Sequence, residues 1–227
     1  MGTVITIRHA QAVAGTLGYP SKMPGTSYGI SAHACITGAK LAKIEGSTCH
    51  KCYALNANYL YPSVAKAHET RLDGIDNALW VAAIVLQLNK VHASGRGRRG
   101  KRIAKGWHRW HDSGDLQSVE HLEKICAVAL ATPRIRHWLP TRELGIVAKY
   151  RAAGGVVPGN LVIRVSATMV DGAQTKAWPT TSGVHDKRPA QGYACPANAR
   201  KGAMKGKCGP CRACWDPAVT AVSYPLH

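Results

Sequence analysis

The sequence predicts an α/β fold whose central sheet is built from parallel βα units. Three strand candidates follow one another after Gly106, and a helical pattern comes after each of the first two. Polar residues concentrate in the turns between these segments, as expected for parallel strands that are covered by helices. The chain has 227 residues and is 45% hydrophobic, so it is long enough to bury a sizeable core.

Apolar periodicity, glycine and proline together place the elements along the chain. Residues 64–92 form one or two helices broken at Asp73-Gly74, and residues 78–88 are apolar nearly all round, which indicates burial. The βα units then comprise a strand at 107–112, a helix at 117–131, a strand at 135–140, a helix at 142–153 and a strand at 161–167. Gly154 and Gly155 end the second of these helices.

The two ends of the chain have a different composition. Residues 1–60 and 168–217 are rich in Gly, Pro, Ser, Thr and Cys, which indicates long ordered loops held by something other than an apolar core. We expect metal to pin these loops. The predicted organisation is a single domain over residues 1–227, with cysteine-containing N-terminal loops (1–60), a βα core (61–167) and a cysteine-rich C-terminal segment (168–227) that closes the core.

The charge balance indicates an anionic partner or substrate. Lys and Arg total 30 against 12 Asp and Glu, which gives a formal net charge of +18, far more than solubility requires. A glycine-rich loop without any acid carries a concentration of this charge at Arg96, Arg98, Arg99, Lys101, Arg102 and Lys105. This basic loop (96–105) is either a solvated segment or one that closes over a polyanion or binds nucleic acid non-specifically. No stacking aromatic lies within it, which weakens a single-strand nucleic-acid interpretation.

Apolar runs and cysteine usage predict the compartment. The longest apolar run, 78–88, is well short of the roughly 20 residues that a membrane helix needs, and no signal-like stretch opens the chain. We therefore expect a soluble, cytoplasmic protein with no membrane partner, in which the cysteines remain reduced.

Four cysteines near the C-terminus have the spacing of iron–sulfur ligands. Cys195, Cys208, Cys211 and Cys214 form C-x12-C-x2-C-x2-C, and Pro196 follows the remote cysteine. Ferredoxins combine three closely spaced thiolates with a distant Cys-Pro in the same way to hold a four-iron (4Fe-4S) cluster. The alternative is zinc, which four thiolates also satisfy, although zinc sites generally use two CxxC pairs.

A second group, Cys35, Cys49 and Cys52, has one ligand too few for a closed site. Three arrangements remain open: a fourth ligand such as His33 or His50, an open iron that binds a substrate oxygen as a Lewis acid, or one cluster shared between the chain ends. The protein would then hold one or two clusters. The spacing differs from that of radical S-adenosylmethionine enzymes. The eighth cysteine, Cys126, lies on the apolar face of its helix and is expected to be a buried hydrophobe.

Polar residues crowd the expected carboxyl ends of the strands, where parallel βα proteins place their catalytic groups. Period-two alternation puts Arg109, His111 and Ser113 on one face of the first strand. We expect proton transfer by His111, Asp112, Asp115 and Glu143, and binding of an anion by Arg109, Ser113, Arg142, Arg164 and Ser166. Some of these residues have simpler interpretations: Asp115 or Ser113 can cap the helix near Gln117, Thr141 can cap the next one, and the histidine can be structural.

The sequence resembles a family of bacteriophage iron–sulfur proteins related to the gene-product-eighty-eight group. The similarity runs from Lys22 to the C-terminus and rests on the segments KMPGTSYGISAHACITGAKLAKIEGSTCHKCYAL, RWHDSGDLQSVEHL, WLPTRE, NLVIRVSA and CGPCRACWD. The resemblance implies an iron–sulfur protein on a TIM-barrel-like scaffold, compact or incomplete at this length, that is expressed in an infected bacterial cell. It points to the same seven cysteines and to residues 109–115.

These patterns together predict a metal-dependent hydrolase. An iron–sulfur cluster would act as a Lewis acid on an anionic ester, most plausibly a phosphodiester, of small-molecule or nucleic-acid origin. One alternative is redox or radical chemistry of the S-adenosylmethionine type. The other is a non-enzymatic protein, with iron–sulfur or zinc sites pinning its loops, that binds nucleic acid through its basic surface.

Overall fold

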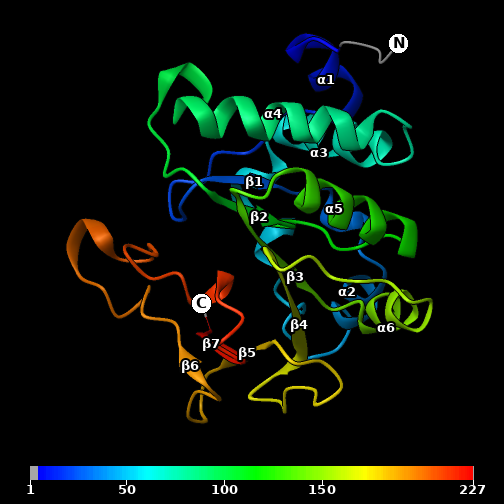
Figure 1. Ribbon diagram of the computed structural model, residues 1–227. Helices are drawn as coiled ribbons and strands as arrows, with labels where there is room; N and C mark the ends of the chain where they lie inside the picture. The colour runs from blue at the N-terminus through cyan, green and yellow to red at the C-terminus, as the bar shows by residue number, and fades with distance from the viewer. Residues whose placement is uncertain (1–4, 227) are drawn as a thin grey trace.

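A seven-stranded parallel sheet organises the computed structural model, which describes residues 5–226 (Figure 1). Its strand order is β1-β2-β3-β4-β5-β7-β6. The strands are β1 (Thr26–Tyr28), β2 (Trp107–Trp110), β3 (Arg136–Thr141), β4 (Leu161–Val170), β5 (Thr181–His185), β6 (Tyr193–Ala194) and β7 (Ala221–Pro225). Every pairing between these strands is parallel. The prediction of a parallel βα scaffold is therefore confirmed.

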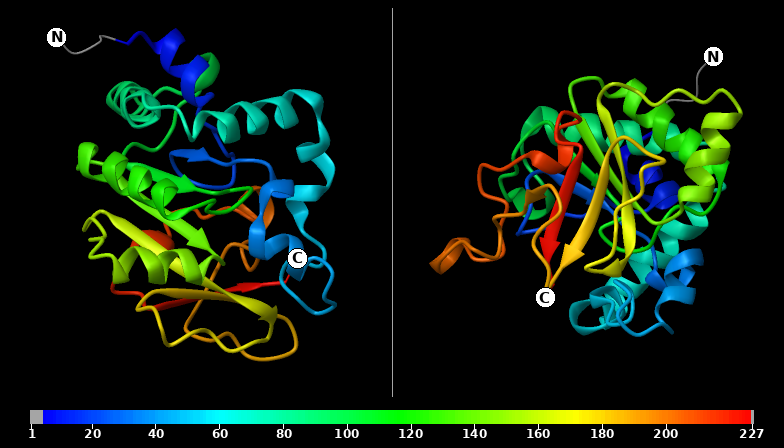
Figure 2. Two further views of the ribbon diagram at one scale, coloured as in Figure 1. Left: turned by 90° about the vertical axis from the view of Figure 1, so that its right-hand side faces the viewer. Right: turned by 90° about the horizontal axis from the view of Figure 1, so that it is seen from below.

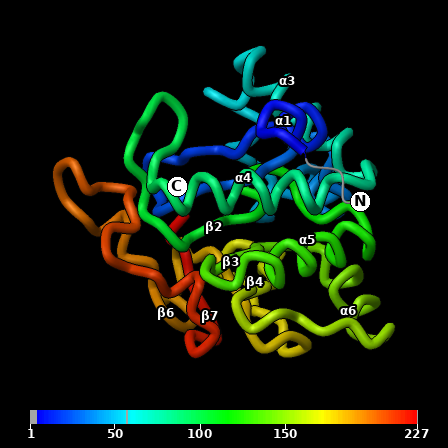
Figure 3. The backbone as a smooth tube through the Cα atoms, turned by 45° about the horizontal axis from the view of Figure 1, so that its top comes forward, coloured from blue at the N-terminus to red at the C-terminus, as the bar shows by residue number. Residues whose placement is uncertain are grey.

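The described chain has six α-helices, four of which pack side by side in a row. They are α1 (Ile7–Ala14), α2 (Ile36–Leu41), α3 (Pro62–Gly74), α4 (Trp80–Ser94), α5 (Val119–Ala131) and α6 (Leu144–Ala152). Contacts join α1 to α4, α4 to α5 and α5 to α6, which produces the row of helices seen in Figure 3. The helix break expected at Asp73-Gly74 is present, because α3 ends at Gly74 and α4 begins at Trp80. The elements expected at 117–131, 135–140 and 142–153 are present within a few residues of those bounds.

The main core lies between the sheet and these helices. Tyr28, Trp80 and Trp110 are fully buried there and meet in edge-on or tilted pairs whose ring centroids are 5.7–5.9 Å apart. Trp80 Nε1 donates to the Tyr28 hydroxyl, which in turn donates to the Ala14 carbonyl. Cys126 belongs to this core, as expected. Burial of these large rings supplies much of the driving force that positions the sheet.

The other face of the sheet is covered by the C-terminal segment. Parallel register places Arg109 beside Trp138 on this face. Trp215 packs edge-on against both Trp107 and Trp138, and Cys214 and Val222 complete this second apolar cluster. These contacts hold the C-terminal chain against this second face of the sheet (Figure 2).

The expectation that both chain ends are loops is wrong in part. Residues 1–60 contain α1, β1 and α2, and the C-terminal region contains β5, β6 and β7. These strands are short or polar, so they lack the apolar runs that identify strands in a sequence, and pairing with longer neighbours defines them. No helix in the described part of the chain has both the length and the apolar character needed to cross a membrane.

Candidate functional site

A cavity of about 2070 Å³ opens at the carboxyl ends of the strands. Its walls include the residues that follow β2, Arg142 after β3, Ser166 in β4 and Gly183 in β5. Six of the seven expected ligand cysteines also line it: Cys35, Cys49, Cys52, Cys195, Cys208 and Cys214. The strand ends and both cysteine groups thus face one common space.

The chain leaves the sheet sharply at the end of β2. The strand ends at Trp110, and His111 has a φ of 49°, in the left-handed region that non-glycine residues rarely adopt. The His111 amide donates to the Tyr28 carbonyl at 2.7 Å, which holds this conformation. Period-two alternation through Arg109, His111 and Ser113 is therefore wrong, because only Arg109 lies within the strand. All three residues nevertheless line the cavity.

Buried polar atoms without a hydrogen-bond partner gather at this point. Among the described residues, these atoms include Arg109 Nε, both ring nitrogens of His111, Asp112 Oδ1 and Ser113 Oγ. His111 and Ser113 are only 3% and 4% exposed. A buried polar group without a partner costs free energy, typically about 1–3 kcal/mol. Several such groups along one cavity wall indicate a surface shaped to receive a polar ligand.

The electrostatics of this wall favour an anion. Burial, His121 and Arg109 lower the pKa of His111 well below its usual range, so its imidazole is neutral at pH 7. The Arg109 guanidinium lies over the Trp138 ring at 4.6 Å. Burial alone would lower the pKa of Arg109, but the neighbouring Tyr53, Asp112 and Tyr224 groups raise it overall. The wall therefore combines a permanent cation with a neutral base.

Asp115 joins the chain after β2 to the end of β3. Its Oδ1 accepts from the Leu116 amide and from the Thr141 hydroxyl at 2.6 Å, and its Oδ2 accepts from the Arg142 amide. Burial raises the pKa of Asp115 to about 6, although these hydrogen bonds and the Arg142 charge oppose the shift. Because its oxygens already hold three donors, Asp115 is placed as a positioning residue.

The residues expected to cap α5 and α6 do not occupy the cap positions of these helices. Ser118 caps α5 by accepting from the His121 amide. Thr141 accepts from the Glu143 amide, but the cap position of α6 is Glu143 itself. The simpler interpretation of Asp115, Ser113 and Thr141 as side-chain caps of the helices that follow is therefore wrong.

Glu143 and Arg164 lie against other chain segments and do not line the cavity. Glu143 accepts from both the amide and the hydroxyl of Thr37, at 2.7 and 2.8 Å, and so fixes the first turn of α2. Arg164 is fully buried and donates to four carbonyl oxygens, those of Thr181, Ala213, Cys214 and Asp216. Ser166 does face the cavity, with its hydroxyl 3.0 Å from that of Ser182.

The N-terminal cysteine group surrounds the start of α2. Cys35 precedes this helix. Burial raises the pKa of the Cys35 thiol to about 12, and the charges of Asp115, Cys52 and Cys49 add to the shift. A Cβ atom at Gly38 would lie 2.9 Å from the Cys35 Cβ and 3.7 Å from the Cys49 Sγ, so a bare glycine is required between the two cysteines. His50 Nδ1 lies 3.3 Å from the Ala42 carbonyl, whereas His33 lines the cavity.

The C-terminal cysteines form a separate group. Burial raises the pKa values of the Cys195, Cys208 and Cys214 thiols. The charge of Cys211 adds to the shift at Cys195 and Cys208, and the charges of Cys195 and Cys208 add to the shift at Cys214. Two phenols approach this group: the Tyr193 hydroxyl is 3.5 Å from Cys211 Sγ and that of Tyr224 is 3.1 Å from Cys214 Sγ. The cysteine charges that act on each of these thiols come from its own group, so the cysteines are grouped as they are in the sequence.

Arginine side chains lie beside both groups, which the cysteine spacing alone does not indicate. Arg142 acts on Cys35 and Cys49, and Arg212 acts on Cys208, each lowering a thiol pKa that burial raises. Arg164 and Arg200 do the same for Cys214 and Cys195. Cations beside buried thiols favour the thiolate form that binds metal.

The cysteines supply thiol donors in both halves of the chain. All eight are free thiols, and thiolates are ligands of iron–sulfur clusters and of zinc alike. Within the described range, no three His, Cys, Asp or Glu side chains form a group that could hold a metal ion.

Three aromatic residues at the cavity were not anticipated. The Tyr53 hydroxyl donates to the Asp112 carbonyl at 2.7 Å, and its ring meets that of Tyr59 at 5.7 Å. Trp138 supports Arg109 from the next strand. Their positions depend on contacts between segments distant in the sequence, which local patterns do not reveal.

Comparison with known proteins identifies one related family. A family model described as Gene product 88 matches residues 7–217. No curated protein and no solved structure matches the chain.

Proposed function

The chain belongs to the Gene product 88 family. From the geometry of its cavity we propose that it is an iron–sulfur hydrolase acting on an anionic diester, a phosphodiester. The observation that carries the proposal is the set of unpartnered buried polar atoms at the end of β2, which line the same cavity as both cysteine groups. An anionic ligand would accept hydrogen bonds from Arg109 Nε and Ser113 Oγ and complement the cationic side chains around them, whereas Asp112 Oδ1 needs a donor, such as a water molecule or a hydroxyl group.

In this proposal Arg109 and Arg142 hold the anion. Arg109 is braced by Trp138, and Arg142 is held by the hydroxyl of Thr48 at 3.0 Å. Arg164 and Glu143 are left out of the reacting set, because their polar atoms hold other parts of the chain. Ser113 and Ser166 remain candidates for hydrogen bonds to the substrate, since both line the cavity.

His111 is proposed to move the proton, with Asp112 beside it. An imidazole whose pKa is well below neutral is a weak base in the empty cavity. A bound phosphodiester anion would favour the protonated imidazole and so raise the pKa of His111 toward neutrality. The substrate would thereby bring the base close to the pKa that general base catalysis at neutral pH requires.

The two cysteine groups are proposed to hold the cofactor. Cys195, Cys208, Cys211 and Cys214 supply four thiolates, and Cys35, Cys49 and Cys52 supply three on another wall of the cavity. A cluster held with one iron open supplies Lewis-acid polarisation of a substrate oxygen. The arginines beside the thiols support this assignment, because they would stabilise the negative charge of thiolate ligands.

We regard the successive parallel strands as an incomplete TIM-barrel-like arrangement whose two chain ends are pinned by the clusters. All residues from 184 to 213 are described and none of them is buried, which supports a role for metal in fixing this segment.

The family resemblance supports expression by a bacteriophage in the cytoplasm of its host, where the cysteines would stay reduced.

Hydrolysis of a chromogenic phosphodiester tests the proposal. Protein purified without oxygen would be assayed in the absence of reductant, as matched cluster-loaded and cluster-free samples whose circular dichroism shows them to be folded. The proposal expects turnover only in the loaded sample. Equal rates would remove the Lewis-acid role. Absence of turnover in both, together with S-adenosylmethionine cleavage on reduction, would replace hydrolysis by radical chemistry.

A further inference from the structure

A second, smaller pocket lies beside the cavity and is lined by an excess of cations. Its volume is about 300 Å³, and its lining includes Lys22, Lys101, Arg102, Lys207 and Arg212 but no Asp or Glu. Pockets without any acid bind anions, because nothing balances the positive charge. Cys208 and Arg212 in its lining belong to the C-terminal cysteine group, but Lys22, Lys101 and Arg102 have no part in the proposed reaction.

The basic pocket and the cavity are continuous. Residues 19–23 and Lys101 line both of them, so Lys22 and Lys101 lie where the two spaces meet. The cavity rim continues the charge through Arg96, Arg98 and Arg99 of the basic loop. In Figures 1 and 3 this loop and the C-terminal segment, which carries Lys207, project on the same side of the molecule. Together they form a basic groove from the reacting wall to the pocket.

Aromatic rings lie along this groove. Tyr53 lines the cavity, is 55% exposed and contacts the backbone of Asp112. Tyr19 lines both spaces, and Gly97 of the basic loop packs against its ring, where a Cβ would come within 2.5 Å. The structure thus supplies the stacking groups that the sequence of the basic loop lacks. Aromatic faces beside a cationic track are the usual means of binding single-stranded nucleic acid.

The size of the space also indicates an extended ligand. The cavity measures about 2070 Å³, which leaves room for an extended ligand beside the proposed clusters, whereas sites for small molecules usually measure roughly 300–1,000 Å³. We propose that the substrate is a single-stranded nucleic acid whose backbone follows the basic groove across Lys22 and Lys101, with a base on Tyr53 beside the reacting wall. This inference rests on the proposed function, since it names the substrate class of that same site.

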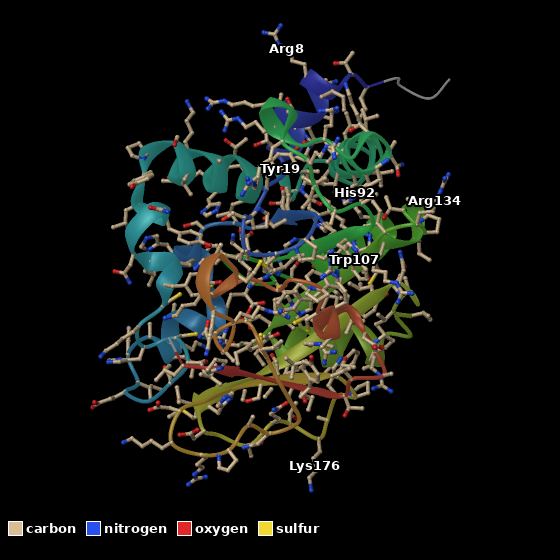
Figure 4. The ribbon with its side chains drawn as sticks, turned by 90° about the vertical axis from the view of Figure 1, so that its left-hand side faces the viewer. Arg8, Tyr19, His92, Trp107, Arg134 and Lys176 are labelled. Atoms are coloured by element: carbon tan, nitrogen blue, oxygen red, sulfur yellow. The ribbon has the colours of Figure 1, made fainter. Side chains whose placement is uncertain are left out.

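Charge-matched variants test the groove. Lys22→Gln/Lys101→Gln removes two charges within it. Arg134→Gln/Lys176→Gln removes two exposed charges elsewhere, and Figure 4 shows both of these side chains pointing outward at the periphery. Binding of a fluorescein-labelled single-stranded oligonucleotide is measured by anisotropy between 50 and 300 mM salt, with a duplex of the same sequence in parallel. The groove variant should bind on the order of tenfold more weakly, and the slope of log K against log salt should fall by roughly 1.4. The control pair should keep both values.

A third variant tests the position of the basic loop without changing charge. Gly97→Ala displaces the loop from Tyr19 and should weaken oligonucleotide binding while leaving hydrolysis of a small diester intact. Equal losses in the two charge-matched pairs, or tighter binding of the duplex, would overturn the proposed groove. Hydrolysis of the small diester without oligonucleotide binding would overturn this inference alone. Oligonucleotide binding without any hydrolysis would overturn the proposed function and leave the groove in place.

Discussion

At the scale of single residues, His111 and Arg109 are assigned different parts of the same reaction. His111→Gln should lower kcat by roughly a hundredfold or more, because it removes proton transfer, and should change KM little. Arg109→Gln should mainly raise KM, since it removes a cation that holds the anion. Steady-state kinetics on a chromogenic diester separates the two effects.

His33→Gln, compared at equal iron content, is a control for this pair, because His33 also lines the cavity but supplies none of the unpartnered buried atoms. It should leave kcat within a few-fold of the parent. A loss in His33→Gln as large as that in His111→Gln would contradict the assignment of the base.

Arg164 is predicted to act on stability. Arg164→Met would leave carbonyls at positions 181, 213, 214 and 216 without their donor, and buried groups of this kind cost about 1–3 kcal/mol each when unpaired. We expect a fall in the free energy of unfolding of about 3 kcal/mol, measured by urea titration. KM for the diester should be unchanged in the folded variant. A raised KM with unchanged stability would return Arg164 to the substrate site.

The sequence identifies residue types at the site better than their roles. The cysteine spacing and the polar run 109–115 can be recognised locally, and the structure brings both to one cavity. The roles of Arg164 and Glu143 cannot, because their partners lie about 50 and 106 positions away in the chain. A buried charge predicts that a partner exists but does not identify it.

At the scale of elements, the long apolar strands and helices could be predicted, and the short strands could not. β4 begins with LVIRV and pairs with a neighbour on each side. β1 has three residues, and β5 reads TSGVH, so neither carries the β-branched, apolar pattern that marks a strand. Both depend on hydrogen bonds from the strand beside them, which only the assembled sheet supplies.

The cysteine-rich C-terminal segment is predicted to fold through its metal. No residue from 184 to 213 is buried, so with the proposed cofactor we expect metal binding and local folding to be coupled there. Cys211→Ser should lower the thermal midpoint by several degrees and lose iron. Cys126→Ala is the control, because Cys126 is a buried cysteine of the α5 core that belongs to neither group. It should keep its iron, whatever packing stability it loses. An unchanged thermal midpoint in Cys211→Ser would contradict the coupling.

At the scale of the whole molecule, a set of buried neutral histidines makes stability dependent on pH. Burial lowers the pKa of His92 to about 4 and those of His121 and His137 to about 3. Burial also lowers the pKa of His108. Hydrogen bonds through Thr26 hold the His92 and His108 rings, and a hydrogen bond with Thr132 holds the His137 ring. The folded protein therefore keeps them uncharged where the unfolded chain would protonate them.

The sign of the effect follows from proton linkage. Below pH 6.5 the unfolded chain binds more protons, so stability is complete above that pH and falls as the pH drops toward 3–4. Each histidine costs about 2 kcal/mol by pH 5. Asp115, whose pKa is raised to about 6, opposes this with a single group. The free energy of unfolding, measured by urea titration at pH 7 and pH 5 at constant iron content, should be several kcal/mol lower at pH 5. A flat profile would contradict the neutral core.

The overall architecture follows from the sequence only as far as its class. Alternating segments predict parallel βα units, and the net charge of +18 predicts an anionic ligand. The sharp departure of the chain at His111, where φ is 49°, decides which polar atoms reach the cavity. That turn depends on the Tyr28 carbonyl more than 80 residues earlier, so no local pattern could have indicated it.

The central claim is that both cysteine groups hold iron–sulfur clusters on the walls of one cavity. The most direct test is an iron, sulfide and zinc count on protein expressed with ample iron and purified without oxygen. The account predicts a brown protein with iron and sulfide in equal amounts, about four of each per cluster, and with only traces of zinc. A colourless protein containing zinc and no sulfide would contradict it.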